Sequence, residues 1–127
     1  MAMTFKAIPE RRSVSGFTLV ELLIVVAIIS LLTAIAIPQF ISYRTSVVDA
    51  QMKNDLKNAA MAMESYHAEY KVYPTSVSGI VAVGFRQTEG VTLSITITSP
   101  STYTLAASKP SGSQPSFTYT STTGAIN

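Results

Sequence analysis

The run from Phe17 to Ile37 constrains the fold more than any other feature of the sequence, because Glu21 is the only charge among its 21 residues. A helix of that length extends about 31 Å, which matches the hydrocarbon thickness of a bilayer. The run is apolar on every side, so it does not fit the amphipathic helix of a small soluble domain. Since only 90 residues (127 − 37) follow it, the chain is too short to enclose it. The run therefore predicts a membrane-spanning helix.

The residues that flank the run predict its orientation and its nature. Lys6, Arg11 and Arg12 precede it closely, so the positive-inside rule places residues 1–16 in the cytoplasm and the body of the chain outside. A secretory signal peptide is disfavoured, because the run is long and ends in Ile37-Pro38-Gln39-Phe40 instead of a small-residue cleavage site. A plain transmembrane anchor remains an alternative.

Beyond the run, the apolar pattern predicts that the helix continues to Tyr70. The extended or turn sequence Tyr73-Pro74 then stops it. Pro38 lies inside this helix, where it cannot donate to the carbonyl of Ala34, and we expect a kink there. Apolar residues at helical spacing form one stripe, with most charges on other faces: Ile41, Val48, Met52, Leu56, Ala59, Ala60, Met63, Tyr66 and Tyr70.

The rest of the chain reads as short strands. Apolar and Thr or Ser residues alternate strictly over 91–98, and the alternation recurs over 103–107 and 117–119. We also expect a more apolar strand at 79–85. Consecutive short strands favour an antiparallel meander, with its apolar face on the helix stripe. The predicted fold class is α+β: a long kinked N-terminal helix, apolar in its first half and amphipathic in its second, packed on a small antiparallel sheet of about residues 79–121.

The most specific motif lies at the start of the apolar run. A basic leader ends in Gly16, Phe17 follows at once, and Glu21 comes four residues later. This arrangement resembles the N-terminus of type IV pilins and of the pseudopilins of type II secretion systems. Ala34-Ile35-Ala36-Ile37-Pro38 and Tyr70-Lys71-Val72-Tyr73-Pro74 fit the same family. Two departures from it stand out: Ser30 replaces a common helix-loosening glycine, and no cysteine is present to staple a C-terminal loop.

The resemblance implies a processing route and a set of domains. A prepilin peptidase would cut between Gly16 and Phe17 and methylate the new Phe17 amine. The implied domains are a cleaved leader (1–16), a transmembrane and filament-core helix (17–40), and a head (41–127) that comprises the helix 41–70 and the sheet. The implied partners are copies of the chain in a helical filament, an inner-membrane assembly platform and a cytoplasmic assembly ATPase. The precursor would sit in the inner membrane and the assembled filament would be extracellular.

Glu21 is the residue that most needs a role, because an ionised carboxylate within hydrocarbon costs at least a few kcal/mol. One hypothesis pairs it with the Phe17 amine of a neighbouring subunit. Since four residues of helix rise about 6 Å, a neighbour displaced by that distance would bring its amine level with the carboxylate and set the register. The alternative is a boundary glutamate that reaches the lipid headgroups.

The functional interpretation is a structural subunit of a type IV pilus, for which the family implies adhesion, motility or DNA uptake. The alternative within the family is a major pseudopilin. Those usually bind calcium through Asp-rich loops, whereas this chain has one acid, Glu89, beyond Tyr73. A membrane protein with one span and a ligand-binding head is the alternative from another class. We expect no cofactor, metal, nucleic-acid partner or enzymatic activity: with His67 as the single histidine and no cysteine, no catalytic triad or thiol nucleophile can form. We expect a surface or helix–sheet contact for His67.

Overall fold

The computed structural model describes residues 1–4 and 15–127, so the leader residues Lys6, Arg11 and Arg12 lie outside the described part. The described residues divide into two units, Met1–Ile37 and Pro38–Asn127. Their elements in chain order are α1 (Leu19–Tyr70), α2 (Val77–Ala82), β1 (Thr92–Ser99), β2 (Thr102–Ser108), β3 (Ser116–Thr120) and β4 (Ala125–Ile126). Helix α1 runs through both units and ends at Tyr70, as the sequence predicts.

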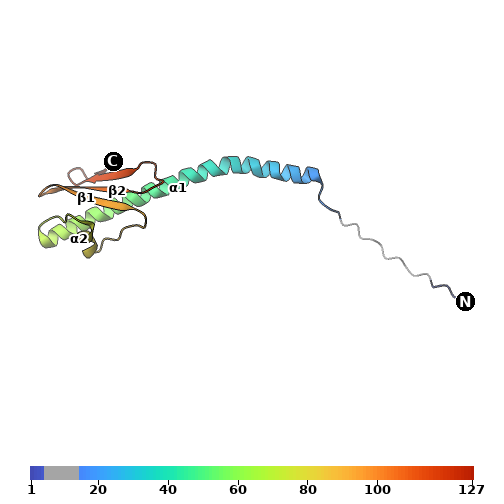
Figure 1. Cartoon of the computed structure of the whole chain (residues 1–127), viewed down its shortest axis with the longest axis horizontal. Helices are drawn as coiled ribbons and strands as arrows, with labels where there is room; N and C mark the ends of the chain where they lie inside the picture. The colour runs from blue at the N-terminus through green and yellow to red at the C-terminus, as the bar shows by residue number, and fades with distance from the viewer. Residues whose placement is uncertain (5–14) are drawn as a thin grey trace. The chain divides into compact units, whose positions relative to one another are not determined.

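The second unit is a four-stranded antiparallel meander laid on the carboxy-terminal part of α1 (Figure 1). The order β1-β2-β3-β4 pairs each strand with the next in the chain, which confirms the predicted α+β fold. Strands β1, β2 and β3 coincide with the three segments of period-two alternation. Alternate side chains of these strands pack against α1 in one core: Leu93, Tyr103, Leu105, Ala107 and Phe117 meet Met52, Leu56, Ala59, Ala60 and Met63.

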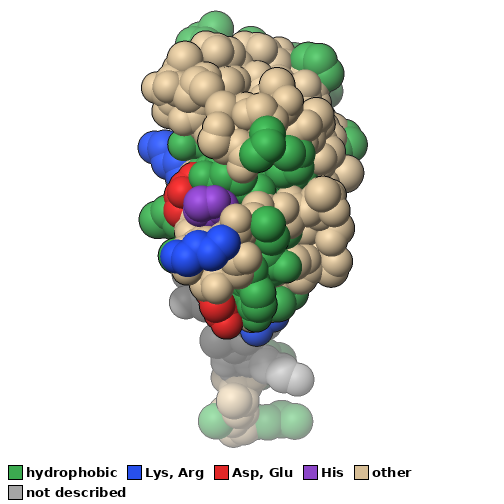
Figure 2. All heavy atoms as spheres, turned by 90° about the vertical axis from the view of Figure 1, so that its left-hand side faces the viewer, with side chains coloured by type: hydrophobic (Ala, Val, Ile, Leu, Met, Phe, Trp, Pro, Cys, Tyr) green, Lys and Arg blue, Asp and Glu red, His purple; other side chains and the backbone are tan. Residues whose placement is uncertain are grey.

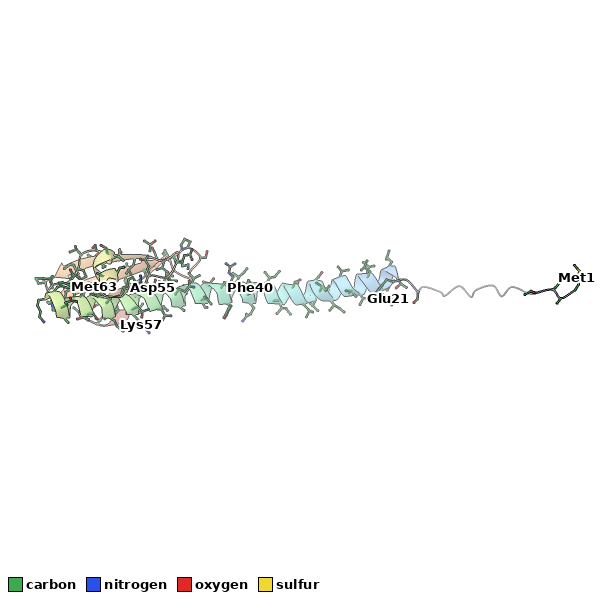
Figure 3. All side chains as sticks on the ribbon, turned by 90° about the horizontal axis from the view of Figure 1, so that it is seen from below. Met1, Glu21, Phe40, Asp55, Lys57 and Met63 are labelled. Carbon is green, nitrogen blue, oxygen red and sulfur yellow. The ribbon has the colours of Figure 1, made fainter. Side chains whose placement is uncertain are left out.

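The predicted helix stripe is correct in the middle and wrong at both ends. The stripe residues Met52, Leu56, Ala59, Ala60 and Met63 are buried, but Ile41 is 59% and Tyr70 is 52% exposed. The core formed with the sheet covers the middle of the stripe, and Ile41 and Tyr70 lie beyond it, where Tyr70 packs on Tyr66 with ring centroids 4.4 Å apart. The expectation that charges avoid this face is wrong for Asp55, which is 2% exposed. Figure 3 shows Asp55 and Met63 on the side of α1 toward the sheet and Lys57 on the other side.

The strand predicted at 79–85 is wrong, because Val77–Ala82 forms the short helix α2. Local backbone bonds hold this turn, from the N–H of Gly79 to the carbonyl of Ser76 and from that of Val83 to Ile80. A Cβ atom at Gly79 would lie 2.6 Å from the Cβ of Pro74, so the turn packs on the proline at a distance that only glycine permits. The sheet therefore begins at Thr92, not near residue 79, and it continues to Ile126, beyond the expected end near 121.

Three carboxylates on α1 fasten other segments of the head to the helix. Asp49 accepts hydrogen bonds from the backbone N–H and the hydroxyl of Ser113, in the loop between β2 and β3. Asp55 accepts from the backbone N–H of Thr88 at 2.8 Å and from its hydroxyl at 2.7 Å. These bonds satisfy the buried carboxylate and fix the segment that leads into β1.

The third carboxylate, Glu64, accepts from the hydroxyls of two tyrosines. Tyr73 donates from the segment after α1 at 3.2 Å, and Tyr103 donates from β2 at 3.0 Å. Burial, with the hydrogen bond to Glu64, raises the pKa of Tyr103 well above its ordinary value, so its hydroxyl stays a donor. Together these bonds anchor the far end of α1 to the sheet.

Candidate functional site at the amino end of the long helix

The amino end of α1 carries a reciprocal capping arrangement between Thr18 and Glu21. The backbone N–H of Thr18 donates to Oε2 of Glu21 at 2.8 Å, and the Thr18 hydroxyl donates to the same oxygen at 2.9 Å. The backbone N–H of Glu21 donates to the Thr18 hydroxyl oxygen at 3.2 Å. Since α1 begins at Leu19, Thr18 is the N-cap residue and Glu21 occupies the third helical position. This is a capping box, which satisfies backbone donors that the first turn leaves free.

The capping box engages only one oxygen of the Glu21 carboxylate. Among the described residues, Oε2 accepts both bonds from Thr18, and no bond reaches Oε1. Both bonds start from Thr18, so a cut before Phe17 would leave them intact. Glu21 lies at the amino end of α1 with its side chain exposed (Figure 3). The carboxylate can therefore cap its own helix and keep one oxygen for a cation from another molecule.

The predicted cleavage position lies in exposed, irregular chain directly before the helix. Ser15, Gly16, Phe17 and Thr18 belong to no helix or strand, and Phe17 is 87% exposed. A Cβ at Gly16 would meet no atom within 4 Å. A peptide bond in such a segment can enter a protease cleft without unfolding α1. Cleavage between Gly16 and Phe17, and methylation of Phe17, remain predictions.

The apolar part of α1 satisfies its other polar side chains internally. The Ser30 hydroxyl donates to the carbonyl of Val26 at 2.7 Å, and the Thr33 hydroxyl donates to that of Ile29 at 2.9 Å. Such bonds back to the preceding turn let hydroxyls enter an apolar medium at little cost. By length and composition α1 can cross a membrane, and none of its apolar window is buried by the chain itself. This surface needs either lipid or other copies of the helix to cover it.

Pro38 lies inside α1, and the helix is assigned without a break from Leu19 to Tyr70. It is the first residue of the second unit. The kink predicted at Pro38 stays a prediction.

His67 lies away from the amino end of α1. Its ring stacks on that of Tyr73, with centroids 4.3 Å apart and the planes inclined by 18°. In the part of the chain that the structure describes, no group of three or more His, Cys, Asp or Glu residues could hold a metal ion.

Thr18 is the residue of this site that the sequence reasoning missed. The signal was present, because Thr18-Leu19-Val20-Glu21 at the start of the apolar run has the spacing of a capping box. The predicted register role of the same glutamate concerns a partner in another subunit. The structure thus gives Glu21 a partner within its own chain, beside any partner in another subunit.

An exposed apolar helix joined to a small sheet defines a class of subunits that are anchored in a membrane and assemble through that helix. Comparison with known proteins places the chain more closely. Residues 11–37 match the family described as the prokaryotic N-terminal methylation motif. Over 102 residues the chain is 33% identical to the Type IV wide pilus major component PilA4 of Thermus thermophilus, covering 80% of this chain and 78% of that protein.

Two further relatives match over shorter lengths. The Type II secretion system core protein G of Pseudomonas aeruginosa is 35% identical over 74 residues, which are 58% of this chain and 52% of that protein. The Type IV major pilin protein PilA of Myxococcus xanthus is 47% identical over 58 residues, 46% of this chain and 26% of that protein. The chain belongs to the type IV pilin family, as its N-terminal motif predicts.

Proposed function

We propose that this chain is the structural subunit of a type IV pilus, made as a prepilin, cut after Gly16 and polymerised into a helical surface filament. The observation that carries the proposal is the apolar part of α1, which is exposed on every side and has Glu21 as its one charge. Once such a helix leaves lipid, only copies of itself can bury it. A head-to-tail contact that does not close on itself generates an open helical polymer.

The processing step has a physical reason in this sequence. Cutting before Phe17 removes Lys6, Arg11 and Arg12, which would otherwise anchor the chain at the cytoplasmic surface. The helix left behind carries a single amine at its tip and is easier to draw out of the bilayer. The partners that follow are a prepilin peptidase, an inner-membrane platform and an assembly ATPase. In this proposal the precursor has its N-terminus in the cytoplasm and its head outside.

Glu21 is proposed to set the register between subunits. Its Oε1 accepts no bond from the described residues, so it can receive the Phe17 amine of a neighbour advanced by about four residues, or 6 Å of helix. A charge pair is tolerated in an apolar core, whereas an unpaired carboxylate is strongly disfavoured there. This requirement would align each incoming subunit.

A major pseudopilin of a type II secretion system is the second candidate, and the 35% identity to a core protein G favours it. That match covers 52% of the relative, whereas the match to the wide-pilus component covers 78%. The longer match supports the pilus.

Two measurements test the proposal. Intact-mass analysis of the native protein should give a chain that starts at Phe17 with a methylated amine; a chain that retains residues 1–16 contradicts it. Electron microscopy should show surface filaments on cells with the gene and none on cells without it. A secretion defect in cells whose surface filaments are unchanged by the deletion would instead establish the pseudopilin.

A further inference from the structure

Residues 40–44 of α1 follow closely on the apolar run that ends at Ile37. At 1.5 Å of rise per residue, Phe40 is about 5 Å and Arg44 about 10 Å past the end of the run. The headgroup layer of a bilayer extends about 5–8 Å beyond the hydrocarbon on each side. Because helix side chains tilt toward the helix N-terminus, those of residues 40–44 reach back into this layer when the run lies in a membrane.

The residue types of this segment are those of a membrane interface. Phe40 is 61% and Tyr43 is 68% exposed, and Figure 3 shows Phe40 on the stretch of α1 that the sheet does not cover. Tyrosine is enriched at the level of the headgroups, because its ring is apolar and its hydroxyl is polar. Arg44 is exposed and is the only basic residue between Phe17 and Lys53. A chain cut before Phe17 therefore keeps one side-chain cation at this depth.

Two hollows of the surface flank the Arg44 side chain. The smaller, of about 240 Å³, lies between α1 and Ser111 of the loop that joins β2 and β3. The larger, of about 370 Å³, runs along α1 and includes Phe40, Tyr43 and Val47 in its lining. A phosphate group can thus approach the guanidinium from the side, and the apolar part of the same ligand has an apolar wall beside it.

Arg44 is the cation of these hollows that lacks a partner in the described residues. Within that part of the chain its guanidinium forms no hydrogen bond or ion pair, whereas the ammonium of Lys109 donates to Gln51 and to a backbone carbonyl, each at 2.8 Å. The nearest acid along α1, Asp49, accepts from the N–H of Ser113 at 2.8 Å. A phosphate from outside the chain would therefore meet a guanidinium whose donors are available.

We propose that Arg44 binds the phosphate of an anionic phospholipid at the membrane surface on the side of the head, with Phe40 and Tyr43 beside the upper part of the lipid. The planar guanidinium presents donors to two phosphate oxygens at once. This inference rests on the membrane placement of the proposed function and adds a role for the lipid. The contact holds a cut subunit at a fixed depth after the leader cations are gone, and it is broken when the subunit is drawn into a filament.

The other cations of α1 lie too far from the membrane for this contact. Lys53 and Lys57 are about 24 and 30 Å past Ile37, well outside the headgroup layer. Since salt screens charge beyond about 8 Å at physiological ionic strength, these lysines feel little of the membrane surface. At the far end of the head, which faces the viewer in Figure 2, basic side chains lie beside acidic ones and the histidine. Lys57, which is exposed, is therefore the matched control for Arg44.

The test counts the lipids that the full chain retains. The chain is placed in nanodiscs of phosphatidylcholine mixed with an equal amount of the anionic phosphatidylglycerol, and native mass spectrometry identifies the lipids that leave the disc with it. Arg44→Gln removes the charge and the guanidinium, and Arg44→Lys keeps the charge. Lys57→Gln removes the same charge farther from the membrane. Thermal unfolding in detergent establishes that each variant keeps the head folded.

The unaltered chain should retain phosphatidylglycerol in preference to phosphatidylcholine. Arg44→Gln should lower that preference about fivefold, which is the factor that one cation contributes at an anionic membrane surface. Arg44→Lys should keep most of the preference, and Lys57→Gln should keep all of it. Added inorganic phosphate should leave the preference unchanged, because the lipid and not free phosphate occupies the site.

Four results would overturn the inference: no preference in the unaltered chain, an unchanged preference in Arg44→Gln, an equal loss in Lys57→Gln, or displacement of the lipid by inorganic phosphate. The nanodiscs hold no filaments, so the outcome does not depend on the pilus. Cells without surface filaments would refute the proposed function and leave the lipid measurement valid, and a failed lipid measurement would leave the pilus intact.

Discussion

Glu21 caps α1 and is proposed to pair with a neighbouring subunit, and two substitutions distinguish these two roles. Glu21→Gln keeps a side-chain oxygen that can accept from the N–H and hydroxyl of Thr18, but it removes the charge. Thr18→Ala keeps the carboxylate and removes the hydroxyl that donates to Glu21 and accepts from its N–H. If the charge sets the register, only the glutamine variant should lose filaments.

The two substitutions should cost different amounts of free energy. Losing an N-cap side chain costs about 0.5–2 kcal/mol, and that cost falls on the first turn of one helix. Removing one partner of a buried ion pair costs about 3–5 kcal/mol, because the Phe17 amine of the neighbour is left uncompensated. At about 1.4 kcal/mol for each factor of ten, Glu21→Gln should weaken the addition of each subunit by roughly a hundredfold to a few thousandfold.

The assay measures subunits sheared from the cell surface against those kept in the membrane fraction, with the intact mass of each. Glu21→Gln should be cut before Phe17, accumulate in the membrane and yield almost no sheared filament. Thr18→Ala should be cut and should assemble. Normal filaments from Glu21→Gln would refute the register role. Equal loss in Thr18→Ala would show that helix capping, and not the charge, supports assembly.

Three further predictions concern the head, each read from thermal unfolding of the full chain in detergent. Asp55→Ala should lower the free energy of unfolding by about 1–3 kcal/mol, because the N–H and the hydroxyl of the half-buried Thr88 lose their acceptor; a wild-type unfolding midpoint would contradict this. Gly112→Ala should cost about 1–3 kcal/mol, since the added Cβ would lie 2.7 Å from Cε of Met52, and an unchanged midpoint would show that the loop yields freely. The hydrogen bond from the Ser113 hydroxyl lowers the pKa of Asp49 below its ordinary 3.8. The stability that this bond contributes is therefore present above pH 3.8 and is lost as the pH falls through the lowered pKa. Asp49→Asn should flatten this loss of stability in acid, and an unaltered dependence of the unfolding midpoint on pH would exclude the effect.

Local sequence patterns predicted the elements in which buried and exposed side chains alternate at a regular spacing. The strict alternation of Leu93, Ile95 and Ile97 with hydroxyl residues is visible in the letters, and it became β1. The end of α1 at Tyr70 followed from the proline four residues later. For β1 one periodic face meets one partner, so the period alone carries the information; for the end of α1 the local backbone restriction at the proline carries it.

The errors arose where a contact distant in sequence decides the outcome. Asp55 looks like a surface charge, and it is buried because Thr88, 33 residues further on, supplies both of its hydrogen bonds. The segment 77–82 is apolar enough for a strand, but it packs as a turn of helix against Pro74. Strand β4 has only two residues, too few for a period, and the backbone of Asn127 bonded to Thr118 holds it in place.

The head has no cysteine, and three carboxylates of α1 join its other segments to the helix. Asp49, Asp55 and Glu64 lie along one helix, and they bind the loop between β2 and β3, the segment before β1, and β2 itself. Each bond joins α1 to a segment at least 33 residues away, apart from that to Tyr73. In the apolar part of α1, by contrast, Glu21 forms its hydrogen bonds within its own first turn. Acid that protonates Asp49 should therefore loosen the contact between α1 and the loop between β2 and β3.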